Sequence, residues 1–212
     1  MTSTFILRDM HEEVLSTSQV KLLPLLKQFS DKFGLVGGTA IALHLGHRHS
    51  IDFDLFTLKR LDSENVLSVV RQNHQIKKTL VDLPNELTIV VDGVKITFLK
   101  YPFEITFTEK FKDIIKTPDL TTLSAMKALS LGRRAKWKDY VDLYFVFKKV
   151  PFGEIIKRAE ELFKGEFNQK LFREQLAYFG DVDYSESVDH VGGVEVIDEA
   201  IKKELKRISC RG

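Results

Sequence analysis

The sequence predicts an α+β protein: a mixed sheet with flanking helices, followed by a helical C-terminal half. Strand-like alternation dominates up to Tyr101, and helical periodicity dominates after it. The dipeptide Asp92-Gly93 lies between two apolar alternating runs and is a strong hairpin signal. We place a boundary near Pro118, which predicts a sheet-containing core over residues 1–118 and a helical domain over residues 119–212.

The first predicted elements surround a glycine pair. Apolar spacing over residues 16–32 predicts an amphipathic helix, in which Pro24 is a blemish or a break. A strand ending at residues 34–37, a helix over 39–45 and a strand over 51–57 follow. Since side chains alternate along a strand, Asp52 and Asp54 should share one face, and Ile51, Phe53 and Leu55 the other.

A hairpin is predicted further along the chain. Ser63 is a plausible N-cap for a helix over residues 65–72, and a strand is expected over 76–81. Strands 86–91 and 94–101 should pair around the Asp92-Gly93 turn, with Val91 opposite Val94 and Thr88 opposite Thr97. The core side is then formed by Ile89, Val91, Val94, Ile96 and Phe98, and the other face carries Lys95 and Thr97.

The second half is predicted to be helical. Residues 103–118 suggest an irregular connection, and residues 180–193 a polar loop. Helices are expected over residues 121–131, 137–149, 152–163, 168–179 and 194–208.

Composition narrows the class of protein. The chain has 212 residues, 43% of them hydrophobic, and a net charge of only +2, so any nucleic-acid contact should come from local clusters. A single cysteine, Cys210, excludes an internal disulfide framework. No apolar run approaches the length of a membrane span, and residues 1–9 lack the architecture of a signal peptide. These features predict a cytoplasmic protein without membrane contact.

The segment from Leu35 to Phe56 carries the first chemical signal. Two neighbouring carboxylates, Asp52 and Asp54, repel each other unless they share a cation, and Mg²⁺ (or Mn²⁺) is usual where phosphates also bind. The pair Gly37-Gly38 would permit a close backbone approach, and a helix starting at Thr39 would direct N–H groups at an anion. Each motif alone is more often a solvated strand face or a turn. Together they predict a nucleoside triphosphate site.

The stretch 127–147 carries the second signal. A helix starting at Trp137 is apolar nearly all round and should be buried, so Asp139 and Asp142 need partners. The candidate partners are cationic: Lys127, Arg133, Arg134, Lys136 and Lys138. One interpretation is a structural salt-bridge network. The other is that Lys127 and one or two arginines contact triphosphate oxygens, while Asp139 orients Lys127 or acts as a base near the metal.

Two weaker signals remain open. His44, His47 and His49 lie close together, but a structural zinc site would need four nitrogen or sulfur ligands, so zinc is disfavoured. Arg48 is expected to contact phosphate or the adjoining acids. The basic cluster at residues 133–138 suits an RNA acceptor or internal pairing equally well.

The pattern Gly37-Gly38-Thr39, twelve residues, Asp52-x-Asp54 resembles the signature of the DNA polymerase β-like nucleotidyltransferase superfamily. The flanking Arg48-x-Ser50-x-Asp52-x-Asp54-Leu55-Phe56 resembles, more narrowly, the AbiEii/AbiGii toxin family. A later block resembles that family too; it contains Lys127, Arg133 or Arg134, and the run Lys138 to Tyr144. The segment of residues 175–181 also resembles that family. The resemblance extends from about Leu35 to Asp181.

The resemblance implies a polymerase β-like fold and a metal-dependent enzyme that moves a nucleoside monophosphate from an NTP to an acceptor hydroxyl. It implies a toxin of a toxin–antitoxin or phage-defence (abortive infection) system, with tRNA or another RNA as acceptor and a cognate antitoxin as partner. The catalytic residues would be Asp52, Asp54, Lys127 and Asp139, the first two binding the metal. The nucleotide-binding residues would be Gly37, Gly38, Thr39, Arg48, Ser50, Arg133 and Arg134.

One departure from the family pattern concerns a third carboxylate. Many superfamily members place it on the strand after a hairpin, where this chain has Lys95 or Thr97. Asp139 could substitute, the enzyme could use one metal, or the chain could be a degenerate nucleotide- or antitoxin-binding protein. Phosphoryl transfer on the same scaffold is a third alternative.

Overall fold

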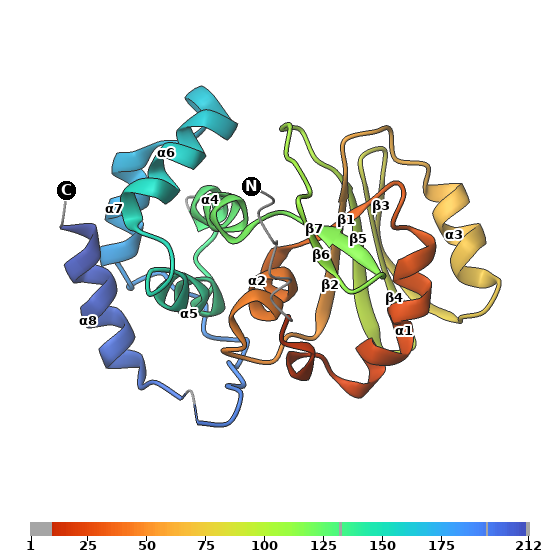
Figure 1. Cartoon of the computed structure of the whole chain (residues 1–212), viewed down its shortest axis with the longest axis horizontal. Helices are drawn as coiled ribbons and strands as arrows, with labels where there is room; N and C mark the ends of the chain where they lie inside the picture. Colours follow the sequence, from red (N-terminus) through yellow and green to blue (C-terminus); the bar gives the residue numbers. More distant parts are fainter. Residues whose placement is uncertain (1–9, 132, 194, 211–212) are drawn as a thin grey trace, which may run out of the picture.

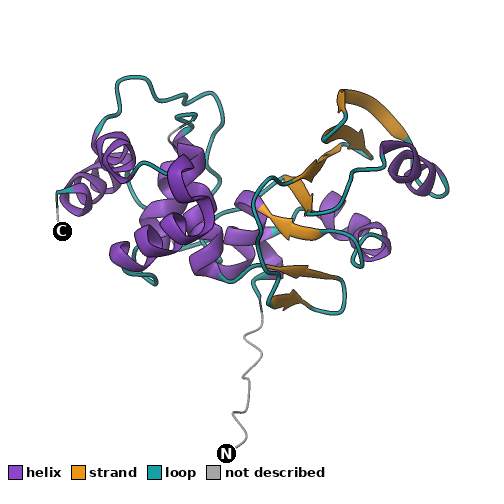
Figure 2. Ribbon diagram, turned by 90° about the horizontal axis from the view of Figure 1, so that it is seen from above, coloured by secondary structure: helices purple, strands orange, loops and turns teal. Residues whose placement is uncertain are grey.

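The computed structural model describes residues 10–131, 133–193 and 195–210. A sheet half and a helical half lie side by side along the long axis, and seen from above the strands gather on one side and most helices on the other (Figures 1 and 2). The strands are β1 (Gly34–Val36), β2 (Asp52–Thr57), β3 (Ile76–Leu83), β4 (Glu86–Val91), β5 (Val94–Lys100), β6 (Glu109–Phe111) and β7 (Ile115–Thr117). The helices are η1 (Glu12–Val14), α1 (Thr17–Gln28), α2 (Gly37–Leu45), α3 (Ser63–Arg71), α4 (Leu120–Leu131), α5 (Trp137–Val146), α6 (Phe152–Phe163), η2 (Lys164–Glu166), α7 (Gln169–Ala177) and α8 (Asp198–Ser209).

The main sheet has five strands in the order β1-β2-β5-β4-β3. β2 and β5 run parallel, and the other neighbouring strands are antiparallel, so the sheet is mixed as predicted. The hairpin register is confirmed, since Val91 pairs with Val94 and Thr88 with Thr97. The parallel pairing of β2 with β5 also places Lys95 beside Asp52 and Thr97 beside Asp54.

One face of the sheet packs into the core, and the other remains open to the helical half. Phe53 and Leu55 are fully buried on the core face, and Phe98 packs edge-on against Phe29 and Phe33, with ring centroids 5.0 and 5.3 Å apart. Helices α1 and α3 cover this core face, on the side of the sheet away from the helical half (Figure 1). The opposite face therefore presents the polar side chains of β2 and β5 to α2 and α4.

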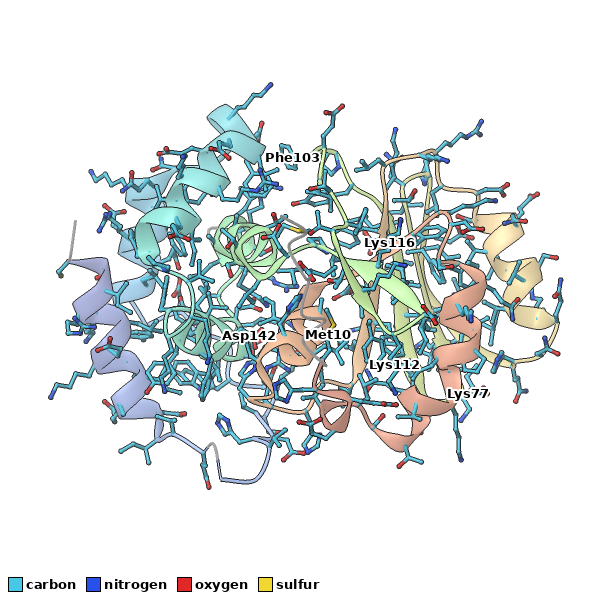
Figure 3. All side chains as sticks on the ribbon, in the orientation of Figure 1. Met10, Lys77, Phe103, Lys112, Lys116 and Asp142 are labelled. Carbon is cyan, nitrogen blue, oxygen red and sulfur yellow. The ribbon has the colours of Figure 1, made fainter. Side chains whose placement is uncertain are left out.

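The two halves share one apolar core. Helix α2 packs against both α4 and α5. Buried residues of the sheet half, such as Leu35 and Ile41, belong to the same hydrophobic cluster as Leu123 and Tyr140 of the helical half. Phe103, labelled in Figure 3, bridges towards α6 through an edge-on contact with Phe163, whose ring centroid is 4.9 Å away.

Several local predictions were wrong, each for a physical reason. Ile51 precedes β2 and is 68% exposed, because the chain has not yet entered the sheet. Asp62, rather than Ser63, caps α3 by accepting from Asn65 N–H. The connection over residues 103–118 is not irregular throughout, since it contains the two-stranded sheet of β6 and β7.

Helix boundaries also differ from the predictions. Helix α1 continues through Pro24 and begins with a capping box between Ser16 and Gln19. Helix α2 begins at Gly37, two residues before the predicted start. The last helix begins at Asp198, whereas the prediction began it at residue 194. Residue 194 lies outside the described residues, as do residues 1–9.

Candidate active site

A cavity of about 830 Å³ lies between the open face of the sheet and the helical half. All eleven predicted site residues line it: Gly37, Gly38, Thr39, Arg48, Ser50, Asp52, Asp54, Lys127, Arg133, Arg134 and Asp139. These residues come from β2, α2, α4, α5 and the loops between them. The fold therefore gathers groups that lie up to a hundred positions apart in the sequence.

Asp52 and Asp54 lie on the cavity face of β2. Burial, and then repulsion from Asp52, raise the pKa of Asp54. Among the described residues no cation lies within ion-pair distance of Asp54, and its carboxylate would be stabilised by a bound positive charge. Two carboxylates on one wall of a cavity fit a single Mg²⁺, which takes one or two protein carboxylates and completes its shell with water and substrate phosphates.

The glycine pair allows side chains to approach the start of α2. Gly37 has a φ of +72°, and a Cβ there would overlap Oδ2 of Asp54. A Cβ on Gly38 would lie 2.6 Å from Nη2 of Arg48. The helix has no side-chain cap, so its first N–H groups are available to an anion in the cavity.

Thr39 and Ser50 hold the beginning of β2 in place. Their hydroxyl oxygens lie 2.7 Å apart, and Thr39 also donates to the backbone carbonyl of Asp52. Gln19 of α1 donates to the same carbonyl at 3.3 Å. The three side chains fix the backbone that carries the carboxylate pair.

Asp142 is the centre of a buried ionic network. It is fully buried and accepts from Arg48 Nε and Nη2 at 2.7 and 2.9 Å, and its Oδ1 lies 2.8 Å from His47 Nε2. Its other oxygen is 2.9 Å from Lys127 Nζ. Burial alone would raise the pKa of Asp142, but Arg48 and Lys127 hold it well below its usual range. Figure 3 shows Asp142 in the middle of the molecule, on α5.

Lys127 connects this network to the cavity. Only 5% of its side chain is exposed, and Nζ lies 2.6 Å from Asp139 Oδ1, while Arg134 Nε lies 3.2 Å from the other Asp139 oxygen. Burial alone would lower the pKa of Lys127, but Asp139 and Asp142 raise it, so Lys127 carries a charge. Arg133 instead reaches Glu166, 3.3 Å away at the surface. The predicted salt-bridge network and the predicted cavity cation are thus the same group of residues.

Lys95 was not among the predicted site residues. Its Nζ lies 2.7 Å from Asp52 Oδ2, and its side chain lines the cavity. The alternation of the hairpin strand puts Lys95 on the non-core face, but only the parallel pairing of β2 with β5 brings it to Asp52. The family resemblance pointed to Lys95 or Thr97 as the place of a third carboxylate, but it did not predict the ion pair with Asp52.

A loop between α7 and α8 also forms part of the cavity wall. We call residues 178–193 the strap; they run from the helical half back towards α2 (Figure 1). Asp189 O accepts from His49 N at 2.7 Å, and Asp183 N donates to Ala135 O at 2.7 Å. Glu186 of the strap forms ion pairs with both Lys136 and Lys138 and lines the cavity.

Glu186 is anionic at neutral pH in this position. Burial would raise its pKa, but hydrogen bonds from Lys136 and Lys138 lower it to about 2. The sequence predicted a polar loop over residues 180–193 and placed residues 178–179 at the end of a helix, because the position of the strap depends on backbone contacts with segments far away in the chain.

The three clustered histidines have separate partners. His44 Nε2 lies 3.2 Å from the carbonyl of Pro118, His47 contacts Asp142, and His49 Nδ1 lies 3.3 Å from the carbonyl of Val14. Across the described ranges, no three His, Cys, Asp or Glu side chains are grouped so that they could hold a metal ion.

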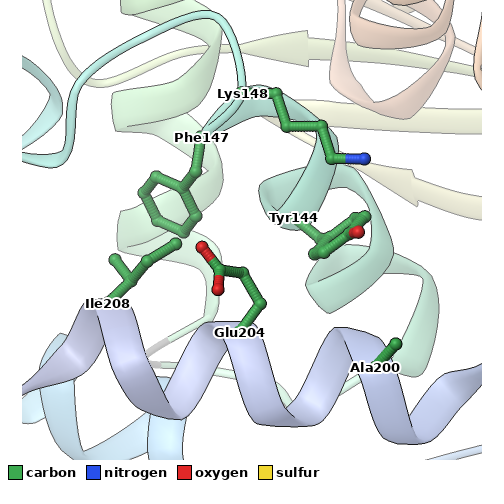
Figure 4. A pocket seen from close by; sticks show the side chains of 6 residues that line it. All are labelled: Tyr144, Phe147, Lys148, Ala200, Glu204 and Ile208. Carbon is green, nitrogen blue, oxygen red and sulfur yellow. The ribbon is translucent and has the colours of Figure 1, made fainter.

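A second, smaller cavity of about 240 Å³ lies between α5 and α8 (Figure 4). It is lined by Tyr144, Phe147, Lys148, Ala200, Glu204 and Ile208. Glu204 pairs with Arg207, and Lys148 lies over the ring of Tyr144. None of the predicted site residues reaches this cavity, so the larger one is the candidate active site.

Comparisons with known proteins concern the family and the fold of this chain. A family model described as Nucleotidyl transferase AbiEii toxin, Type IV TA system, matches residues 25–103. An uncharacterized protein of Aquifex aeolicus (strain VF5) is 32% identical over 187 residues, covering 82% of this chain and 86% of the relative.

Two solved structures share the fold. MenT4, a nucleotidyltransferase toxin of Mycobacterium tuberculosis H37Rv, superimposes with a TM-score of 0.59 at 15% identity over 90% of this chain and 81% of its own. JHP933 of Helicobacter pylori gives a TM-score of 0.54 at 18% identity over 94% and 88% of the two chains. No helix within the described residues is both long and apolar enough to cross a membrane.

Proposed function

Because the chain belongs to the AbiEii family of nucleotidyltransferases, we propose that its larger cavity transfers a nucleoside monophosphate from an NTP to an acceptor hydroxyl. The single observation that carries the proposal is the convergence on one cavity of two carboxylates from β2 and a buried, charged lysine from α4. Acidic groups that suit a divalent cation and cationic groups that suit phosphates are the components that nucleotidyl transfer needs.

The residues take distinct roles in the proposed reaction. Asp52 and Asp54 would hold Mg²⁺, which when bound offsets charge on the phosphates. The first N–H groups of α2, from Gly37 to Thr39, bind triphosphate oxygens. Lys127 and Arg134 contact the triphosphate from the opposite wall of the cavity. Arg48 and Ser50 support the start of α2, where the phosphates bind. Arg133 lies at the rim of the cavity and contacts the phosphate oxygens nearest to solvent.

Bonds and charges balance as follows. The acceptor hydroxyl oxygen forms a bond to the α-phosphorus and gives its proton to water, while the bond from that phosphorus to the bridging oxygen of the β-phosphate breaks and its electron pair stays on that oxygen. Pyrophosphate leaves, and its charge is stabilised by Lys127 and the arginines. We assign Asp139 the task of orienting Lys127, because both its oxygens are engaged by cations.

By family, the biological role proposed is that of a toxin with tRNA or another RNA as acceptor and a cognate antitoxin as partner. The test is to incubate the protein with Mg²⁺, total tRNA and an NTP labelled at the α-phosphate. We expect label on RNA with the wild type, and a loss of at least about 100-fold in Asp52→Asn and Asp54→Asn. A γ-labelled NTP in parallel separates phosphoryl from nucleotidyl transfer.

A second candidate function is nucleotide or antitoxin binding without turnover. The observation that favours it is the pair Lys95 and Thr97 at the position of the third carboxylate. If NTP binds by calorimetry but no label reaches any acceptor, and the Asp52→Asn change leaves toxicity in cells unaltered, the binding function is supported and the enzymatic one fails.

A further inference from the structure

The wall beside the carboxylate pair carries a positive charge where catalytic centres of the two-metal type carry a third acid. Lys95 is the parallel neighbour of Asp52, and Thr97 is the parallel neighbour of Asp54. Neither side chain can add a negative charge. The cavity therefore offers two carboxylates and one ammonium group within two adjacent strands.

The contact between Lys95 and Asp52 is direct. Nζ lies 2.7 Å from Oδ2, the distance of a charge-assisted hydrogen bond. The lysine side chain is 42% exposed, and Asp52 is 23% exposed, so the pair faces the cavity and is not part of the core. One oxygen of Asp52 is thereby engaged, and Asp52 Oδ1 and the Asp54 carboxylate remain for a metal ion.

Among the described residues, no other acid that lines the cavity, Asp189 of the strap included, joins Asp52 and Asp54 in a group that could hold a metal. Asp139 is engaged by Lys127 and Arg134, and Glu186 by Lys136 and Lys138. Glu86 pairs across the sheet with Leu99, which neighbours Phe56, so Glu86 lies one row beyond the carboxylate pair. Within the described part of the chain, no group of three acidic or imidazole side chains could hold a metal.

From this arrangement we propose that the active site takes up one divalent cation per chain, and that Lys95 occupies the place of a second cation beside Asp52. The inference rests on the proposed function and specifies its metal requirement. Lys95 acts as a positioning residue: it holds Asp52 in one orientation and supplies a fixed positive charge next to the reacting phosphate. A second dication at the same carboxylate would be repelled by this ammonium group.

The test uses Mn²⁺ as the probe, together with NTP analogues whose α–β bridge cannot be cleaved. Two Mn²⁺ ions bridged by one carboxylate lie about 3.5–4 Å apart and couple magnetically, whereas a single ion gives an uncoupled electron paramagnetic resonance spectrum. We expect the uncoupled spectrum from the wild type with saturating analogue, after subtraction of the spectrum of Mn²⁺ and analogue without protein.

Substitutions separate the role of Lys95 from that of any surface charge. Lys95→Asp supplies the third acid and should produce the coupled spectrum of two ions. Lys100→Asp is the matched control, because Lys100 lies on the same strand but is exposed and does not line the cavity, so its spectrum should remain uncoupled. Lys95→Met should keep one ion and lose at least about 10-fold in transfer. Circular dichroism melts check that each variant is folded.

Each outcome decides the inference. A coupled spectrum from the wild type overturns it, and so does an uncoupled spectrum from folded Lys95→Asp, since Lys95 would then not be what excludes a second ion. Full transfer activity in Lys95→Met overturns the positioning role. If the wild type binds neither analogue nor Mn²⁺, the proposed function itself fails, and that result is distinct from binding two ions.

Discussion

Single residues in this protein hold the charges that its cavity needs. Lys127, Arg48 and Asp142 are each at most 5% exposed, so their charges are sustained by one another and not by water. A buried pair adds little net stability over an apolar pair, but a buried charge left without a partner is strongly destabilising. The site therefore needs the whole ionic network, because each buried charge depends on the others as its partners.

Asp142→Ala should destabilise the protein by about 3–5 kcal/mol, because Arg48 and Lys127 would remain buried without their shared partner. Urea denaturation measures the change in the free energy of unfolding. The control is Asp113→Asn, at an exposed aspartate, which should stay within about 0.5 kcal/mol of the wild type. Equal effects of the two changes would contradict the role assigned to Asp142.

The network also predicts a pH dependence of stability. The pKa of Asp142 is lower in the folded than in the unfolded protein, so its contribution is fully present above about pH 4, the unfolded value. That contribution is lost as the pH falls through the folded pKa. Below about pH 4, the wild type should therefore lose stability with falling pH more steeply than Asp142→Asn. Parallel curves for the two proteins would refute this.

Gly37 should be needed for the position of Asp54, and not only for the backbone. Gly37→Ala should cost about 1–2 kcal/mol for its positive φ and, by displacing Asp54, about 100-fold in transfer. Gly93→Ala is the matched control, because Gly93 has a φ of +88° but no atom within 4 Å of an added Cβ. Gly93→Ala should lose stability but keep its transfer activity. If both variants keep full activity, the close approach to Asp54 has no functional role.

Among the larger elements, the strap connects α7 to α8 and forms part of the cavity wall. Its backbone bonds reach His49 on one side and residues Ala135 and Trp137 on the other. Glu186 adds ion pairs to Lys136 and Lys138 at the start of α5. Apolar side chains of the strap, Phe179, Val182, Val188 and Val191, also pack against the core, so polar and apolar contacts together hold the strap in place.

Glu186→Gln should loosen the strap, because a neutral amide cannot hold two lysines. Hydrogen exchange followed by mass spectrometry should show faster exchange at the amides of His49 and Asp183, with the sheet unaffected. Glu204→Gln, which removes an ion pair on α8 away from the strap, should leave those amides as in the wild type. Unchanged exchange in Glu186→Gln would show that the backbone bonds and the apolar packing hold the strap without the Glu186 ion pairs.

Elements with a strong local signal were predicted well. Helix α6 has the bounds that its apolar spacing predicts, and the hairpin register follows from the Asp92-Gly93 turn, because turn geometry fixes which residues face each other. The small sheet of β6 and β7 was missed, since three-residue strands are too short for a period to show. The sequence does not distinguish Ser63 from Asp62 as the cap of α3, because both residue types cap helices equally well.

For the whole molecule, the shared core suggests that the two halves unfold together. Trp137, the only tryptophan, lies in the helical half, and far-ultraviolet circular dichroism reports both halves. We expect the two signals to give coincident urea transitions, as in a two-state protein. Separate transitions would support instead the predicted division into residues 1–118 and 119–212.

Most of the larger elements and the candidate residues of the site follow from the sequence. Local periodicity, turn residues and the order of the motifs are properties of short segments, so Asp52, Asp54, Lys127 and Asp139 could be proposed as site residues before any coordinates. Which of these charges meet depends on how distant segments pack in the folded protein. The pairing of β2 with β5 brings Lys95 to Asp52, and the packing of α2 against α5 brings Arg48 to Asp142. Such contacts join segments that are distant in the chain, and their free energy depends on burial, which no local pattern records.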